Sequence, residues 1–150
     1  MAIFKGSGVA IVTPFKEDGS IDYDKLDELI DYHCENGTDS IIICGTTGES
    51  ATMTEEEHMD CVKFAIERTR KRIPVVAGTG SNCTRTAIDM SKEAAENGAD
   101  AVSYTHLFPS CILATLRPQS EKYTQAPTPV SISYSSNFFV IISYRVFAPS

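Results

Sequence analysis

Three threonines recur at a fixed spacing, each directly after a short apolar run. Thr13, Thr46 and Thr79 are separated by 33 residues. The runs that precede them are rich in β-branched residues and cover 9–12, 41–44 and 73–77. A period of this length is typical of a strand–loop–helix–loop unit. Continuous apolar runs are typical of parallel strands that are covered on both faces. The spacing therefore predicts a repeated βα unit.

The segments between these runs carry the start and stop signals of helices. Asp22 is expected to cap a first helix, which Asn36-Gly37 ends. Thr54–Glu57 has the pattern of a capping box at the start of a second helix. A third helix is expected to begin near Thr84 and to end at Asn97-Gly98. The two stop segments, 35–41 and 96–102, resemble each other, so a fourth strand is expected to begin near residue 101.

Strand–helix alternation leaves two common architectures, the open doubly wound sheet and the closed barrel. A dinucleotide-binding sheet calls for a G-x-G-x-x-G pattern after its first strand. Here the first run ends in Thr13-Pro14-Phe15, and Gly78-Thr79-Gly80 lacks a third glycine. The sequence therefore favours an α/β fold that is a partial TIM (β/α)₈ barrel, with the first three βα units and the start of the fourth strand.

The composition changes sharply near residue 101. All nine glycines lie at or before Gly98, and only four charged residues follow Asp100. Five of the seven prolines lie in the second part, where only 130–134 and 138–147 look strand-like. We therefore expect residues 1–101 to form the N-terminal part of the barrel and residues 102–150 to be an unrelated, non-homologous tail.

The first residues of this tail suggest an artefactual origin. The peptide Val102-Ser103-Tyr104-Thr105-His106-Leu107 can be encoded by the end sequence of a transposon used to prepare sequencing libraries. We expect the reading frame to run from a real gene into adapter and unrelated DNA, and the tail after about residue 107 to lack packed architecture. The alternative is a divergent natural C-terminus.

Charge and cysteine content limit the classes of function. The net charge of −7 and the absence of a basic stripe argue against nucleic acid as a partner. No apolar run is long enough for a membrane span, and the N-terminus lacks a signal peptide's apolar stretch, so a cytoplasmic location is expected. The five cysteines have no C-x-x-C spacing and are expected to be reduced. No metal and no cofactor are implied.

In a barrel, the chemistry belongs to the loops that follow the strands. These loops begin at Thr13-Pro14, at 45–50 and at 78–82. The loop Gly45-Thr46-Thr47-Gly48-Glu49-Ser50 is the most suggestive, because glycines let backbone amides approach a small carboxylate while a hydroxyl relays protons. The alternative is a turn that only connects a strand to a helix. Glu49 is expected to be a structural carboxylate that bonds to loop amides.

Three segments resemble the dihydrodipicolinate synthase (4-hydroxy-tetrahydrodipicolinate synthase) family in sequence, order and spacing. They are GVAIVTPF at 8–15, CGTTGESATM at 44–53 and IPVVAGTGSN at 73–82. The resemblance covers about residues 1–101, roughly a third of a family member's length. It implies a homotetrameric (β/α)₈ barrel whose lysine forms a Schiff base with pyruvate, and whose enamine attacks L-aspartate 4-semialdehyde in lysine and diaminopimelate biosynthesis.

The resemblance also implies roles for individual residues. Thr46 would belong to a proton relay between two tyrosines, and Thr47 would bind the pyruvate carboxylate. A possible effector site would comprise Ser50, Ala51, His58 and Asn82. Members that lysine inhibits commonly have a histidine at the position of Glu55 and a glutamate at that of Thr86. We therefore expect lysine to inhibit the parent enzyme weakly or not at all.

The chain departs from the family pattern after residue 101. The T-P-Y-Y motif is replaced by Thr105-His106-Leu107-Phe108-Pro109, and the surroundings of Lys122 do not resemble the family's lysine strand. The 150-residue chain is therefore expected to be inactive. The alternatives are an N-acetylneuraminate lyase or a 2-keto-3-deoxy sugar-acid aldolase of the same superfamily, or a non-functional fragment.

Overall fold

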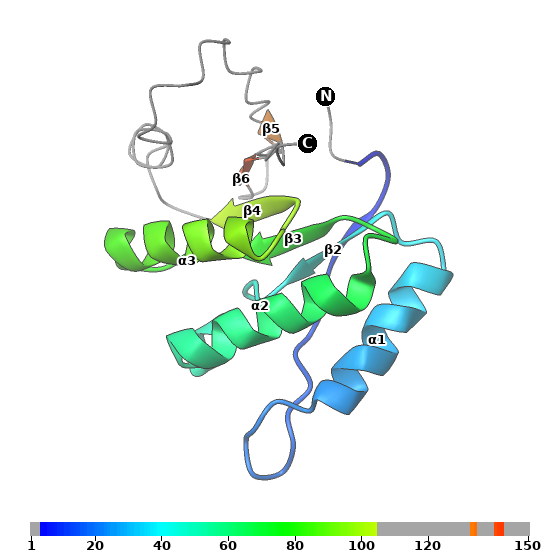
Figure 1. Cartoon of the computed structure of the whole chain (residues 1–150), viewed down its shortest axis with the longest axis horizontal. Helices are drawn as coiled ribbons and strands as arrows, with labels where there is room; N and C mark the ends of the chain where they lie inside the picture. Colours follow the sequence, from blue (N-terminus) through cyan, green and yellow to red (C-terminus); the bar gives the residue numbers. More distant parts are fainter. Residues whose placement is uncertain (1–3, 105–132, 135–139, 143–150) are drawn as a thin grey trace.

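The computed structural model describes residues 4–104, 133–134 and 140–142. Its first part alternates strands and helices, as the repeat predicts (Figure 1). The elements are β1 (Gly8–Ala10), α1 (Tyr23–Glu35), β2 (Ser40–Ile43), the 3₁₀ turn η1 (Ser50–Thr52), α2 (Glu55–Thr69), β3 (Val75–Gly78), α3 (Thr84–Glu96), β4 (Ala101–Tyr104), β5 (Ser133–Tyr134) and β6 (Val140–Ile142). None of the described helices combines the length and apolar character that crossing a bilayer requires.

The four strands of the repeat pair in parallel and in sequence order. The sheet order is β1-β2-β3-β4-β6-β5. Val9 pairs with Ile41, Ile41 with Val75, and Ala77 with Val102. A doubly wound sheet of the dinucleotide-binding type would instead reverse its strand order in the middle. The sequential order is that of a (β/α)₈ barrel, so the predicted partial barrel is confirmed.

The three helices cover one face of the sheet (Figure 1). Ile41, Val75 and Val102 share that face and belong to one buried core. The helices contribute to this core mainly through Leu26, Ile30, Val62, Ile66, Met90 and Ala94. Alternate strand residues point to the opposite face, where Gly8 lies beside the Phe4 ring and the Ile42 side chain. That opposite face is the one a closed barrel would turn inward.

The predicted helix signals have the expected geometry. The Asp22 side chain accepts a hydrogen bond from the Lys25 amide and caps α1. Thr54 and Glu57 form both bonds of a capping box at the start of α2. Gly37 and Gly98 follow α1 and α3 with positive φ angles of 78° and 93°, which glycine adopts without a steric penalty. Local signals therefore account for the starts of α1 and α2 and for the ends of α1 and α3.

The second part of the chain is described only in part. The segments expected to be strand-like, 130–134 and 138–147, contain β5 and β6. Strand β6 pairs antiparallel with β4, and Tyr104 lies opposite Val140. The prediction that residues after about 107 lack packed architecture falls mainly outside the described residues.

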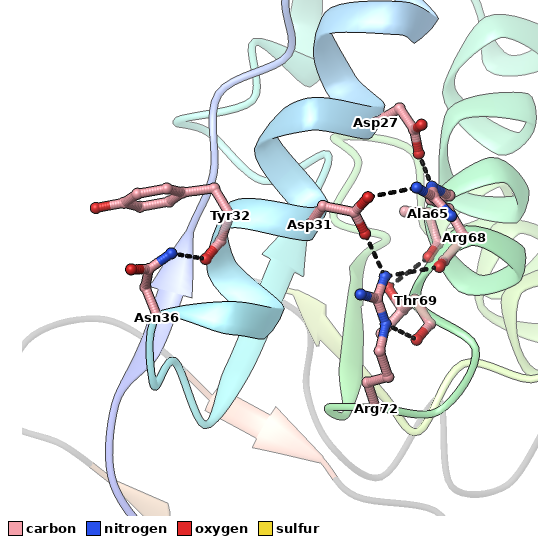
Figure 2. A network of polar contacts seen from close by, with 8 residues as sticks. All are labelled: Asp27, Asp31, Tyr32, Asn36, Ala65, Arg68, Thr69 and Arg72. Atoms are coloured by element: carbon pink, nitrogen blue, oxygen red, sulfur yellow. Dashed lines mark hydrogen bonds and ion pairs between the residues drawn. The ribbon is translucent and has the colours of Figure 1, made fainter.

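An ion-pair network joins α1 to α2 and to the turn after α2 (Figure 2). Asp31 accepts hydrogen bonds from Arg68 and from Arg72, the latter over 2.5 Å, and Arg68 also pairs with Asp27. Arg72 donates in addition to the backbone carbonyls of Arg68 and Thr69. The side chains are only partly exposed, at 31% for Asp31 and 26% for Arg68. Solvent screens such pairs less than fully exposed ones.

We predict that Asp31→Ala lowers the free energy of unfolding by about 1 kcal/mol, because it leaves two arginines without their shared carboxylate. Asp60→Ala, at an exposed position of α2, is the matched control and should change stability by less than about 0.5 kcal/mol. Urea unfolding followed by circular dichroism measures both values. Equal effects of the two variants, or no reduction of the Asp31 effect in 1 M salt (a screening length of about 3 Å), would contradict an ionic role for the network.

Candidate active-site loops at the carboxyl ends of the strands

The loops after β1 and β2 are joined by a buried hydrogen bond. The Thr13 hydroxyl donates to the Gly48 carbonyl over 2.8 Å, and Thr13 is only 4% exposed. The loop after β3 is joined in turn to β4, because the Thr79 amide donates to the Ser103 carbonyl over 2.9 Å. The carboxyl ends of the four strands therefore form one continuous, hydrogen-bonded edge.

The loop after β2 folds back on itself and leaves its two threonines outside. The amides of Gly48 and Ser50 donate to the Gly45 carbonyl, and the Glu49 amide donates to that of Thr46. Thr46 and Thr47 are exposed. Within the described residues, no hydrogen bond uses their hydroxyls or amides as donors. These groups are therefore available to a small anionic ligand.

The backbone conformation of this loop depends on two close approaches to Cys44. A Cβ atom on Gly78 would lie 2.4 Å from the Cys44 carbonyl oxygen and 2.8 Å from the Gly45 amide nitrogen. A Cβ atom on Gly48 would lie 3.2 Å from both the Cα and the amide nitrogen of Cys44. Cys44 itself has a positive φ of 52°. The end of β2 thus packs directly on the backbone of β3, where only a residue without a side chain fits.

A hydroxyl chain anchors the next loop to α3. Thr79 is fully buried, and its hydroxyl lies 2.8 Å from that of Ser91. Ser91 donates in turn to the Ala87 carbonyl over 2.6 Å, so Thr79 is the donor to Ser91. The repeated threonines therefore differ in role: Thr13 and Thr79 lie in the interior and hold loops, whereas Thr46 faces solvent.

His58 ties the first turn of α2 to the end of β3. Its Nε2 atom lies 2.6 Å from the Gly78 carbonyl, which makes Nε2 the protonated donor. Burial lowers the pKa of His58, while the bond to the Gly78 carbonyl opposes that shift. Because folding lowers this pKa, the stabilising contribution is present above the ordinary histidine value and decreases as the pH falls toward the folded-state value.

The expected effector residues lie around the amino ends of α2 and α3. Ala51 and Asn82 are exposed, Ser50 is half-buried, and His58 is 4% exposed. The Thr86 hydroxyl donates to the Glu55 carboxylate over 3.3 Å, which links the first turns of the two helices. Of these four residues, His58 is the buried one, and its ring is already bonded to the Gly78 carbonyl.

Two other expectations have clear outcomes. Glu49 was expected to bond to loop amides, but its carboxylate is exposed and makes no capping bond to η1, so that expectation is wrong. Glu49 instead adopts a positive φ of 56° at the start of η1. The described cysteines are free thiols, as predicted. In the described part of the chain, no three histidine, cysteine or acidic side chains are grouped as metal ligands.

The fold and the loop together define a class: a (β/α)₈-barrel protein whose second loop presents free hydroxyls and amides at the carboxyl edge of the strands. A model of the dihydrodipicolinate synthetase family matches residues 3–109. The chain belongs to this family. The match reaches beyond residue 101, where the composition changes.

Individual relatives agree with this assignment. The chain is 71% identical over 102 residues to the 4-hydroxy-tetrahydrodipicolinate synthase of Lachnoclostridium phytofermentans, an alignment that covers 68% of this chain and 35% of the relative. The chain thus spans about a third of the length of that relative. The dihydrodipicolinate synthase of Acinetobacter baumannii complexed with pyruvate matches with a TM-score of 0.65 and 50% identity, over 67% of this chain and 34% of that structure.

A further match comes from a more distant member. YagE, a prophage protein of the dihydrodipicolinic acid synthase family from Escherichia coli K12, was solved in complex with pyruvate. It matches with a TM-score of 0.68 and 28% identity, over 76% of this chain and 40% of that structure. Pyruvate is therefore a ligand of two family members that share this part of the fold.

We predict that Gly78→Ala lowers the free energy of unfolding by about 1–3 kcal/mol, because the new methyl group would overlap the Cys44 carbonyl. Gly45→Ala is the matched control, since its Cβ would meet only the Ile42 side chain, at 3.7 Å, and should cost less than about 1 kcal/mol. Urea unfolding measures both variants. A Gly78→Ala chain as stable as Gly45→Ala would show that the close approach does not constrain this loop.

Proposed function

We propose that residues 1–101 are the N-terminal part of a 4-hydroxy-tetrahydrodipicolinate synthase. This lyase condenses pyruvate, held as a lysine Schiff base, with L-aspartate 4-semialdehyde. The observation that carries the proposal is the pair of solvent-facing threonines, Thr46 and Thr47, on a hydrogen-bonded loop at the carboxyl edge of the strands. The names of the similar proteins and the pyruvate bound to two of them support the same reading.

The two threonines have different proposed tasks. Thr47 binds the pyruvate carboxylate through its hydroxyl and amide, because a carboxylate accepts several donors at once and a charged acceptor strengthens each bond. Thr46 passes protons during Schiff-base formation, a step that needs several transfers beside the anchored anion. The tyrosines that would complete this relay in the family are not among the described residues.

The 150-residue chain is proposed to be inactive by itself. Schiff-base chemistry needs an amine that faces the bound pyruvate. Lys25, Lys63 and Lys92 lie on the outer helices, and Lys71 donates to the Gly98 carbonyl and to Asp100. Lys5 and Lys16 lie outside the strands as well, so no strand within residues 4–104 carries a lysine. The catalytic lysine and the aldehyde-binding residues are assigned to the later units of the parent barrel, which is proposed to be a homotetramer.

The proposal places the end of the parent sequence at about residue 101 and treats 102–150 as an unrelated tail. Genomic DNA across codons 98–110 tests this boundary directly. Codons for T-P-Y-Y in the genome would establish the tail as foreign. An uninterrupted genomic reading frame through residue 150 would make the tail natural and overturn the boundary.

We predict that a chimaera restores activity when residues 1–101 are joined to the remainder of the Lachnoclostridium phytofermentans relative. Thr47→Val in this chimaera should raise KM for pyruvate about tenfold, since a charge-assisted bond is lost. Thr46→Val should lower kcat about a hundredfold. Thr46→Ser and Thr47→Ser keep the hydroxyls and serve as the matched controls, expected to retain most of the activity.

Borohydride trapping with pyruvate provides the second readout. The chimaera should form a stable pyruvyl adduct on one lysine, whereas the 150-residue chain should form none. An adduct on the 150-residue chain would show that its own lysine is catalytic. Preferential turnover of N-acetylneuraminate or a 2-keto-3-deoxy sugar acid by the genomic parent would favour the sugar-acid aldolase reading instead.

The proposed effector site consists of Ser50, Ala51, His58 and Asn82. We predict weak or no inhibition of the chimaera by lysine, because Thr86 has no charge to hold an amino group. Thr86→Glu should lower the inhibition constant for lysine about tenfold, the value of one charge-assisted bond. Thr84→Glu, which places the same charge two residues earlier at the start of α3, is the control. Sub-millimolar inhibition of the unmodified chimaera would refute the prediction.

A further inference from the structure

Two buried cysteines lie beneath the loop that carries Thr46 and Thr47. Cys44 directly follows β2, and Cys61 lies in the middle of α2. They are 1% and 0% exposed and belong to the same buried core. Both are free thiols. Cys44 begins the family-like segment 44–53, whereas Cys61 lies outside all three segments, and the proposed reaction uses neither thiol.

A contact with the His58 carbonyl places the Cys44 thiol against α2, close to Cys61. The Cys44 sulfur lies 3.8 Å from the His58 carbonyl oxygen. In a helix this carbonyl is directed toward the residues three and four positions later, the first of which is Cys61. The two thiols interact with each other, and Cys61 also interacts with the Thr13 side chain.

We propose that Cys44 and Cys61 are an oxidisable dithiol, a modification site at which a peroxide converts two buried thiols into a disulfide that fixes the loop to α2. Hydrogen peroxide is the oxidant class that suits this position, because it is small enough to enter a packed interior. The proposal does not depend on the proposed synthase activity.

The reaction balances with one peroxide for each disulfide. The Cys61 thiolate attacks one peroxide oxygen, the O–O bond breaks, and the released hydroxide takes up the proton that Cys61 lost, which gives one water and a sulfenic acid. The Cys44 sulfur then attacks the Cys61 sulfur. Its proton leaves with the sulfenic hydroxyl as a second water, and the S–S bond forms. Two thiols are oxidised and one peroxide is reduced to two waters.

The electrostatic setting agrees with this order of steps. Interaction with the Cys44 side chain lowers the pKa of Cys61, whereas interaction with Cys61 and burial raise the pKa of Cys44. Cys61 is therefore the thiol that ionises first, and Cys44 keeps its proton until the second step. Cys34 is half-buried and Cys83 is exposed, so neither shares this environment.

Bond formation would act on the loop directly. A disulfide shortens the sulfur separation to about 2.05 Å. The Cys44 carbonyl already packs on Gly78, and the Cys44 Cα lies against Gly48. The strand end therefore has little room to move independently, and a covalent bond to α2 draws the loop with it.

The test is peroxide treatment of the folded chain, followed by alkylation in denaturant and digestion with trypsin and a glutamate-specific protease. Cleavage after Glu35, Glu49, Glu57 and Lys63 places the two thiols in separate peptides, 36–49 and 58–63. The expected product is these peptides joined, with the loss of two hydrogen atoms. Cys34→Ser and Cys83→Ser should leave it unchanged, and Cys61→Ser should abolish it.

Unfolded chain under the same peroxide treatment is the control for proximity. There the shorter Cys34–Cys44 loop is expected to close at least as readily as Cys44–Cys61, because loop-closure entropy grows with length. The proposal would be overturned if peroxide oxidised Cys83 in the folded chain while Cys44 and Cys61 remained reduced and were later alkylated. Hydrogen exchange of segment 45–53 should slow after oxidation, and unchanged exchange would overturn the link to the loop.

Discussion

Each helical crossover in this chain returns to the same face of the sheet, because the four parallel strands follow one another in sequence order. Three consequences follow from this constraint. All three helices share one core with Ile41, Val75 and Val102. The carboxyl ends of these four strands lie at one edge of the sheet. The other face carries small residues such as Gly8, which a closed barrel turns toward its interior.

Backbone proximity then fixes the loop that defines the family resemblance. Gly78 and Gly48 let the end of β2 lie against β3 and against its own loop. The Thr13 hydroxyl closes the loop from the β1 side. These contacts use the loop backbone and the Thr13 hydroxyl, so the side chains of Thr46 and Thr47 remain available at the surface. A small carboxylate would meet donors that are already positioned, which reduces the ordering cost of binding.

Much of this arrangement could be predicted from the sequence, since it depends on local signals. Capping at Asp22 and Thr54, and the left-handed glycines after the helices, need only neighbouring residues. The strand order could be predicted only indirectly, from the absence of a phosphate-binding glycine pattern after the first strand. The separate roles of the three threonines could not be predicted, because burial of Thr79 beside Ser91 depends on how α3 packs.

The features that the sequence did not predict depend mostly on contacts between segments that are distant in the chain. The proximity of Cys44 to Cys61 and the hydrogen bond from His58 to Gly78 are examples. No repeat or motif in the sequence relates the positions of these residues to one another. Glu49 has a positive φ, which a glutamate rarely adopts and which the sequence does not indicate. Sequence patterns specify the repeat and its limits, whereas tertiary packing decides which polar groups are used inside it.

The most direct test of the central claim is the strand order in solution, measured by nuclear Overhauser effects between backbone protons of labelled chain. The account predicts contacts between Val9 and Ile41, between Ile41 and Val75, and between Ala77 and Val102. A doubly wound order would place β1 beside β4. Backbone contacts between Gly8–Ala10 and Ala101–Tyr104 would therefore contradict the barrel assignment.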